Sequence, residues 1–174
     1  MAKTVCLSTI TKAGRPTARI VMLRDFDDNG FVFTTNVNSR KAKELIENPF
    51  ASLTFHWRGS RQVRIEGAVT RITFEETKEL FSKRARDAQI GEWVSEDLSG
   101  VIADVDAAAS AAAKVRKRFE GVEPIPCPPF FTGFRIACDS IEFWEGSNVV
   151  GKAHERILYE SEEGGEYRPT RLCP

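Results

Sequence analysis

Two β-rich runs joined by a tight turn signal limit most strongly what this chain can fold into. The first run covers residues 17–24, and its side chains alternate between the two faces of an extended strand. One face holds Ile20 and Met22, and the other holds Arg19, Val21 and Leu23. The second run starts at Phe31, after the sequence Asp-Asp-Asn-Gly, which favours a chain reversal. The two runs therefore predict an antiparallel hairpin.

A short helix is expected directly after the hairpin, over residues 40–47, with Ser39 as its N-cap and Asn48-Pro49 as its stop. The first backbone N–H groups of a helix attract anions. Hydroxyl and cationic side chains gather at this junction, namely Thr34, Thr35, Arg40 and Lys41. The pattern indicates a phosphate site, to which Arg19 and Arg24 would add charge. The same cations would also suit a solvated sheet edge, and spacing alone leaves both interpretations open.

Charge and cysteine content argue against several classes of function. The 174 residues carry 25 basic and 25 acidic side chains, so a nucleic-acid or membrane-surface role has no electrostatic support. The four cysteines are widely spaced, which is typical of reduced thiols. With only two histidines besides, the sequence indicates no metal site. No apolar run is long enough for a membrane span, and we expect a cytoplasmic protein.

The rest of the chain predicts a mainly antiparallel β-structure with helices beside it. Short turns connect the strands, and a small closed or nearly closed barrel would remove their exposed edges. The length suits one domain, residues 1–174. Further strands are expected at residues 5–11, 50–57, 61–71, 133–138, 141–144 and 156–160. Helices are expected from the capping box at residues 73–76 to about 84, at 87–94, and from Asp104 or Asp106 through 119.

Several motifs in a fixed order resemble the pyridoxamine 5′-phosphate oxidase family, and the resemblance covers nearly the whole chain. They are Arg-x-x-x-Leu-Arg at 19–24, Phe-x-Thr-Asn-x-x-Ser-Arg-Lys at 33–41, Arg-Gln-Val-Arg-Ile-Glu-Gly at 61–67, Ser-Lys-Arg-Ala-Arg-Asp-Ala-Gln-Ile-Gly at 82–91, Glu-Phe-Trp at 142–144 and the closing Arg-Leu-x-Pro. The resemblance implies an α+β, mainly β fold, an antiparallel split β-barrel with flanking helices. It also implies a homodimer with two FMN sites at the subunit interface.

The resemblance further implies which residues bind FMN. The matching positions are Arg19, Ile20, Val21, Met22, Leu23, Arg24, Thr34, Thr35, Arg40, Lys41, Gln62, Trp144 and Arg156. Arg40 and Lys41 would neutralise the phosphate. The Gln62 amide would meet the polar edge of the flavin, and Trp144 would offer it a flat apolar surface. Without the resemblance, Trp144 would be interpreted as a core aromatic and Gln62 as an exposed strand residue.

In the family, FMN accepts a hydride from pyridoxamine or pyridoxine 5′-phosphate, and oxygen reoxidises it with formation of hydrogen peroxide and pyridoxal 5′-phosphate. The implied function is thus an FMN-dependent oxidase of vitamin B6 metabolism, acting on a small phosphorylated B6 vitamer. The positions implied to bind this substrate are Arg24, Arg84, Lys152 and His154. Two of them, Lys152 and His154, would lie beside the substrate ring and are the candidate catalytic residues.

The substrate positions depart from the family pattern more than the FMN positions do. Leu80 and Ala88 stand where the family has a tyrosine and a serine that bind the substrate phosphate. Two arginines remain to bind it, and a charge-assisted contact is worth roughly 1.5–3 kcal/mol. A Gln-Ser pair that helps to hold FMN is replaced by Asp97-Leu98.

The family's Arg-Leu-His-Asp-Arg motif is replaced here by Lys-Ala-His-Glu-Arg at 152–156. Lys152 matches the substrate-facing arginine if a gap precedes it, and Val150 takes that place if there is none. Two alternatives to the oxidase therefore stay open: an FMN-dependent oxidoreductase with another substrate, and a non-catalytic protein that binds FMN or pyridoxal phosphate. Arg84 and His154 favour the enzyme.

Overall fold

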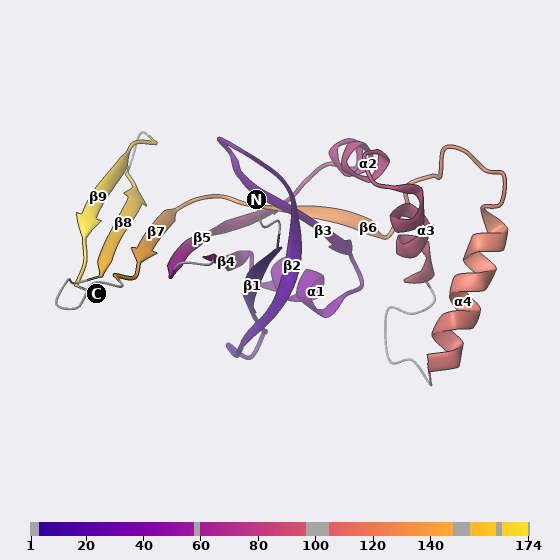
Figure 1. Ribbon diagram of the computed structural model, residues 1–174, viewed down its shortest axis with the longest axis horizontal. Helices are drawn as coiled ribbons and strands as arrows, with labels where there is room; N and C mark the ends of the chain where they lie inside the picture. The colour runs from indigo at the N-terminus through magenta and orange to yellow at the C-terminus, as the bar shows by residue number, and fades with distance from the viewer. Residues whose placement is uncertain (1–3, 58–59, 97–104, 148–153, 163–164, 174) are drawn as a thin grey trace. The chain divides into compact units, whose positions relative to one another are not determined.

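The computed structural model describes residues 4–57, 60–96, 105–147, 154–162 and 165–173 (Figure 1). Its elements are β1 (Thr4–Ile10), β2 (Pro16–Asp27), β3 (Gly30–Asn36), α1 (Arg40–Glu47), β4 (Phe50–Trp57), β5 (Arg61–Arg71), α2 (Phe74–Ser82), α3 (Arg86–Val94), α4 (Val105–Arg118), β6 (Phe131–Ile136), β7 (Ser140–Glu145), β8 (Glu155–Ser161) and β9 (Tyr167–Arg171). In this part of the chain no helix is both long and apolar enough to cross a membrane.

The strands form one sheet in the order β4-β1-β2-β3-β6-β5-β7-β8-β9. An additional pairing of β4 with β5 closes the first six of these strands into a barrel, so the barrel strands have no open edge between them. Strands β7, β8 and β9 extend the sheet from β5 as antiparallel neighbours. This arrangement confirms the predicted antiparallel barrel with flanking helices.

The predicted hairpin is formed by β2 and β3, with Asp27 opposite Gly30 at its turn. Gly30 has a φ of +126°, and a Cβ atom added there would lie 2.1 Å from the carbonyl oxygen of Ile136, so only glycine fits. The alternation of β2 is also confirmed, because its outward side chains Ile20 and Met22 are 68% and 44% exposed. The opposite face of β2, which carries Arg19, Val21 and Leu23, is half-buried.

The described chain divides into two compact units, and the expectation of a single domain stays a prediction. The first unit comprises residues 1–33, 44–70 and 134–174, and the second comprises 34–43 and 71–133. The core of the first unit is the barrel interior, where the rings of Phe33 and Phe134 stack 5.8 Å apart. Its most deeply buried apolar side chains are Val5, Leu7, Val32, Phe33, Leu53, Ile65, Phe134 and Ile136.

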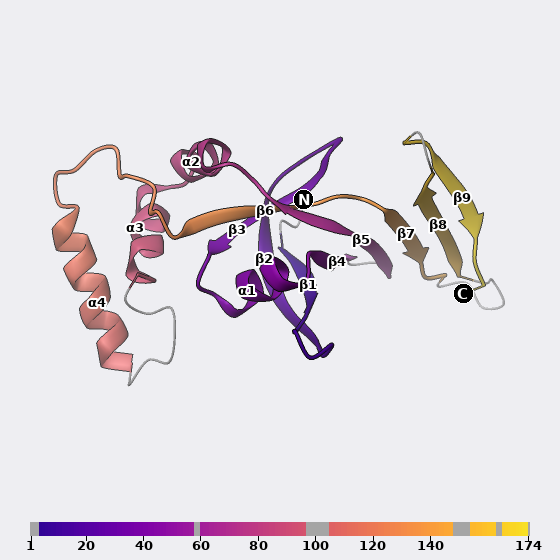
Figure 2. The same ribbon diagram turned by 180° about the vertical axis from the view of Figure 1, so that it is seen from behind.

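The second unit has a core of its own, made where α3 and α4 lie side by side (Figures 1 and 2). Trp93 of α3 is central to it: its ring meets that of Phe119, and its indole N–H donates to the carbonyl of Pro126 at 2.8 Å. The predicted capping box is present at the start of α2, where the Thr73 and Glu76 side chains each accept a hydrogen bond from the other's backbone N–H. The core consists of Phe81, Ile90, Trp93, Val115, Phe119, Ile125 and Phe131.

One strand, β9, has no counterpart among the predicted elements. All five of its residues are exposed, so the sequence shows no alternation of apolar and polar positions. It also contains Pro169, which lacks the N–H that an inner strand needs but is tolerated in a strand with one neighbour. β9 is the last strand in the sheet order, where both features are compatible with pairing.

Candidate cofactor and substrate sites

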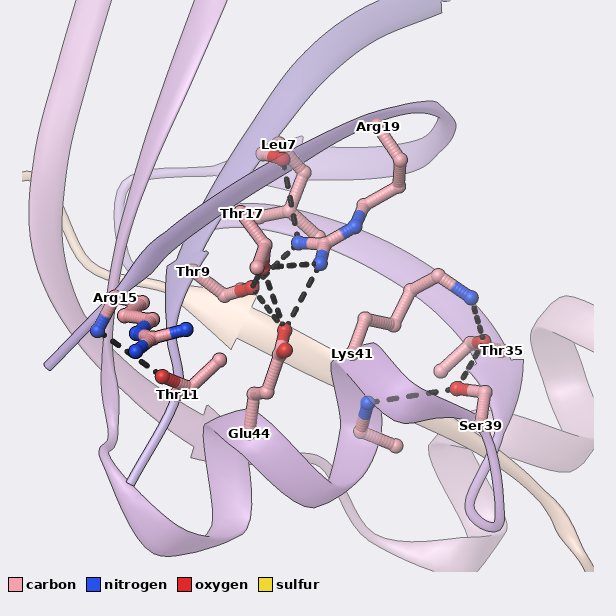
Figure 3. A network of polar contacts seen from close by, with 11 residues as sticks. Leu7, Thr9, Thr11, Arg15, Thr17, Arg19, Thr35, Ser39, Lys41 and Glu44 are labelled. Carbon is pink, nitrogen blue, oxygen red and sulfur yellow. Dashed lines mark hydrogen bonds and ion pairs between the residues drawn. The ribbon is translucent and has the colours of Figure 1, made fainter. Parts of the chain in front are cut away.

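Hydroxyl and ammonium groups from the end of β3 and the start of α1 form a cluster within the second unit (Figure 3). The Ser39 hydroxyl accepts a hydrogen bond from the Ala42 N–H at 3.4 Å, so Ser39 is the N-cap that the sequence predicts. The Lys41 ammonium donates to Thr35 Oγ1 at 3.1 Å, and the Thr35 and Ser39 hydroxyls are 3.2 Å apart. A cation and two hydroxyls at a helix N-terminus are the groups that bind a phosphate.

Thr34 adds a polar atom that no described residue satisfies. Its Oγ1 is buried and has no hydrogen-bond partner among the described residues. A buried hydroxyl without a partner costs about 1–3 kcal/mol, and a ligand that accepts a hydrogen bond from it would remove this cost. Thr34 directly precedes Thr35 on β3, so the orphaned hydroxyl fits a phosphate-bearing group near the start of α1.

Arg19 lies in a different network, within the first unit, where it contacts Glu44 (Figure 3). Its Nη2 is 2.9 Å from Glu44 Oε2, and its guanidinium also donates to the hydroxyls of Thr9 and Thr17. Those hydroxyls are themselves 2.6 Å and 2.9 Å from the same carboxylate oxygen. The Glu44 side chain is only 6% exposed. The structure thus places the Arg19 charge against a buried carboxylate.

The end of β2 places Arg24 at an apolar pocket rather than in this network. Arg24 is half-buried, its Nη1 donates to Met22 Sδ at 3.2 Å, and the pocket is contained in the first unit. Ile20 and Met22 point outward, whereas Val21 and Leu23 are half-buried. The pocket is lined by Leu23, Arg24, Asp25, Phe26, Phe31, Phe55, Trp57, Val63, Ile65, Ile141 and Phe143.

Three residues predicted to meet the flavin lie in one row across three neighbouring strands of the first unit. Gln62 of β5 is opposite Trp144 of β7, and Trp144 is opposite Arg156 of β8. Together with Arg64 and Glu142 they line a shallow pocket. Arg156 Nη2 donates to Glu142 Oε2 at 2.8 Å, and this hydrogen bond raises the pKa of Arg156 above its ordinary value. The row combines an amide, an indole and a cation, which are the groups expected around a flavin.

His154 lies next to this row, with its ring centroid 5.2 Å from that of Trp144. The backbone N–H of Ser147 donates to His154 Nδ1 at 2.9 Å, so in the neutral imidazole the proton is carried by Nε2. His154 also lines a pocket that includes Arg156 and Arg171. The remaining candidates of this segment, Lys152 and Val150, and the Asp97-Leu98 pair lie outside the described residues.

Arg84, in the second unit, is nearly covered. Its guanidinium carbon lies 5.4 Å from the centroid of the Phe131 ring, and its side chain is 12% exposed. Its Nη1 is 2.6 Å from Glu92 Oε1. Leu80 and Ala88, the two departures from the family pattern, are both half-buried.

Two carboxylates that form ion pairs with predicted site residues were not themselves predicted. Glu44 pairs with Arg19, and Glu92 pairs with Arg84. Glu44 had a usable signal, because it stands between the apolar Ala42 and Leu45, which are buried like Glu44 itself. Glu92 had none, since it is separated from Arg84 by the turn between two helices, which sequence spacing does not resolve.

Comparison with known proteins finds related sequences and structures. A family model described as pyridoxamine 5′-phosphate oxidase matches residues 1–119, and one described as the pyridoxine 5′-phosphate oxidase C-terminal dimerisation region matches 131–174. The chain is 45% identical over 172 residues to a pyridoxine/pyridoxamine 5′-phosphate oxidase of Acidothermus cellulolyticus. The matched region covers 97% of this chain and 75% of the relative.

Two solved structures are similar in fold. One is PhzG from Burkholderia lata 383 in complex with tetrahydrophenazine-1-carboxylic acid, with a TM-score of 0.89 and 31% identity over 99% of this chain and 83% of that chain. The other is a pyridoxamine 5′-phosphate oxidase-related, FMN binding protein from Nostoc punctiforme, with a TM-score of 0.79 and 19% identity over 99% of this chain and 89% of that chain.

Proposed function

Because this chain belongs to the pyridoxamine 5′-phosphate oxidase family and is an oxidoreductase of that type, we propose that it uses FMN to oxidise a phosphorylated B6 vitamer. The observation that carries the cofactor proposal is the polar cluster at the first turn of α1. Lys41, Thr35 and Ser39 form a connected set there, and the buried Thr34 hydroxyl has no partner among the described residues. These groups suit a phosphate monoester.

In this proposal the FMN phosphate is bound by Thr34, Thr35, Arg40 and Lys41. The Thr34 hydroxyl donates a hydrogen bond, and the two cations offset the phosphate charge. The ring of FMN is bound by a second set of residues, Gln62, Trp144 and Arg156, which lie in register across β5, β7 and β8. When bound, FMN supplies the oxidation of the substrate carbon, with oxygen as the final electron acceptor.

The protein's own part in the reaction is to bind and orient the substrate and to hold protons at defined atoms. His154 keeps its neutral-state proton on Nε2, because Nδ1 already accepts from the Ser147 backbone. Nε2 is thus a hydrogen-bond donor toward the substrate ring in this proposal. Arg24 and Arg84 supply the positive charge for the substrate phosphate, and Lys152 adds a third cation if it takes the position that the resemblance implies.

We also propose a homodimer. The family model that matches residues 131–174 describes a dimerisation region. The outward face of β2 supports a partner surface, since Ile20 and Met22 are exposed there although apolar side chains gain free energy when they leave water. Sedimentation equilibrium should give about twice the mass of the 19.5 kDa chain. A monomer that still binds FMN tightly would contradict this part of the proposal.

The test of the function is product analysis with purified, FMN-loaded protein. Pyridoxamine 5′-phosphate in air should give pyridoxal 5′-phosphate, hydrogen peroxide and ammonia in equal amounts, because water hydrolyses the oxidised amine. A second candidate, an FMN-dependent oxidoreductase with another substrate, is favoured by Leu80 and Ala88, whose side chains cannot donate hydrogen bonds to a phosphate. Bound FMN without any of these products would support that second candidate and overturn the first.

A further inference from the structure

We propose that Glu92 competes with the substrate phosphate for Arg84, and so sets how strongly the enzyme binds a phosphorylated substrate. The inference rests on the proposed role of Arg84 as a ligand of that phosphate. It makes Glu92 a specificity-determining residue, since a carboxylate beside Arg84 weakens the binding of an anion much more than that of a neutral substrate.

The two residues are brought together by consecutive helices of the second unit. Arg84 follows the end of α2, where its backbone N–H donates to the Phe81 carbonyl at 3.1 Å. Glu92 lies in the last turn of α3, between the buried Gln89 and Ile90 on one side and Trp93 on the other. Arg84 lies in the short turn between α2 and α3, and Glu92 lies in α3 itself, so the two residues meet across this turn with Arg84 Nη1 2.6 Å from Glu92 Oε1.

The surroundings of Arg84 leave little room for two anions at once. The Phe131 ring covers one side of the guanidinium, and the Arg84 side chain is only 12% exposed. The Glu92 side chain is 23% exposed, so solvent reaches this carboxylate more easily than it reaches Arg84. A phosphate that approaches Arg84 must therefore displace Glu92 or lie beside its negative charge, and both cost free energy.

A purely structural role for Glu92 makes a different prediction. If the ion pair only held α2 and α3 together, its loss would lower thermal stability and impair all substrates alike. Competition instead predicts tighter anion binding after the loss of the carboxylate, because Arg84 keeps its charge while its protein partner is removed. The direction of the change in affinity thus separates the two roles.

The experiment compares Glu92→Gln with the wild-type holoenzyme. Inorganic phosphate, titrated by calorimetry, should bind about three- to tenfold more tightly to the variant, and the KM for pyridoxamine 5′-phosphate should fall by a similar factor with kcat nearly unchanged. Glu92→Asp retracts the carboxylate by one methylene and should give a smaller gain. The matched control is Asp87→Asn, which removes a charge from the same helix at an exposed ion pair with Arg116; it should change neither quantity.

A double-variant cycle assigns the effect to Arg84. In an Arg84→Gln background, Glu92→Gln should no longer strengthen phosphate binding. Phosphate affinity that is unchanged or weaker in both Glu92 variants, at unaltered melting temperature, would overturn the inference even if the vitamer is oxidised. If no variant oxidises the vitamer while Glu92→Gln still tightens phosphate binding through Arg84, the competition stands and the proposed substrate fails.

Discussion

The Glu44 carboxylate and the Arg19 guanidinium, 25 residues apart in the sequence, form a half-buried ion pair at 2.9 Å. Glu44 lies on α1 one turn after Arg40, and Arg19 lies on β2. The hydroxyls of Thr9 and Thr17 donate to the same carboxylate oxygen. The helix whose first turn carries the proposed phosphate ligands is therefore tied to β1 and β2 by one side chain (Figure 3).

Replacement of Glu44 by glutamine should destabilise the protein. The change leaves the Arg19 charge without its partner, and we expect a loss of about 1–3 kcal/mol in the free energy of unfolding, a range reduced for the partial exposure of Arg19. Urea unfolding of the FMN-free protein measures it. The control is Glu47→Gln, which removes an exposed carboxylate from the same helix and should change stability by less than about 0.5 kcal/mol. Equal effects of the two changes would contradict the anchoring role.

Loss of the two cations at the start of α1 should weaken FMN binding without unfolding the protein. Each charge-assisted contact is worth roughly 1.5–3 kcal/mol, so Arg40→Ala with Lys41→Ala should raise the Kd for FMN by about two orders of magnitude or more. Flavin fluorescence titration measures the Kd. Lys43→Ala is the matched control, since Lys43 is an exposed cation of the same helix. An unchanged Kd in the double variant would remove these residues from the phosphate site.

Restoring the missing hydroxyls should improve the use of phosphorylated vitamers. Leu80→Tyr together with Ala88→Ser returns two hydrogen-bond donors to the positions where the family binds the substrate phosphate. We expect kcat/KM for pyridoxamine 5′-phosphate to rise about tenfold, mainly through a lower KM, because better anchoring aligns the substrate. Steady-state oxygen consumption measures both constants. A fall in kcat/KM with intact FMN binding would place the substrate phosphate elsewhere.

His154 should affect turnover rather than cofactor binding. His154→Ala removes the Nε2–H donor beside Trp144, and we expect kcat to fall about ten- to a hundredfold while the Kd for FMN changes by less than about threefold. The other histidine, His56, is exposed on β4, and His56→Ala should leave kcat unchanged. Equal kcat values for the wild type and His154→Ala would show that His154 takes no part in the reaction.

Local signals were sufficient to predict most elements of the fold. Four consecutive residues are enough to predict the capping box at Thr73 and Glu76. Four residues also predict the turn that ends at Gly30. The helix at 40–47 and the strands at 50–57 and 61–71 have the predicted bounds. These features depend on backbone groups and near neighbours, which the sequence order already brings together.

The ion pairs around the candidate site residues could not be predicted from such local signals. The partner of Arg19 is 25 residues away on a helix, and the partner of Arg84 lies across a turn between two helices. Sequence order showed the cations but not the carboxylates opposite them, because ion pairing between separate elements depends on tertiary packing. Resemblance to a family adds the ligand-binding positions, yet it says nothing about a residue such as Glu92 that lies between the motif positions.

The central claim is that a bound flavin in this protein oxidises a phosphorylated B6 vitamer. The most direct measurement is the visible spectrum of FMN-loaded protein before and after addition of pyridoxamine 5′-phosphate in the absence of oxygen. The account predicts loss of the visible absorbance band of the oxidised flavin, its return when air is admitted, and formation of pyridoxal 5′-phosphate. A flavin spectrum that stays unchanged on addition of both pyridoxamine and pyridoxine 5′-phosphate, while FMN remains bound, would contradict it.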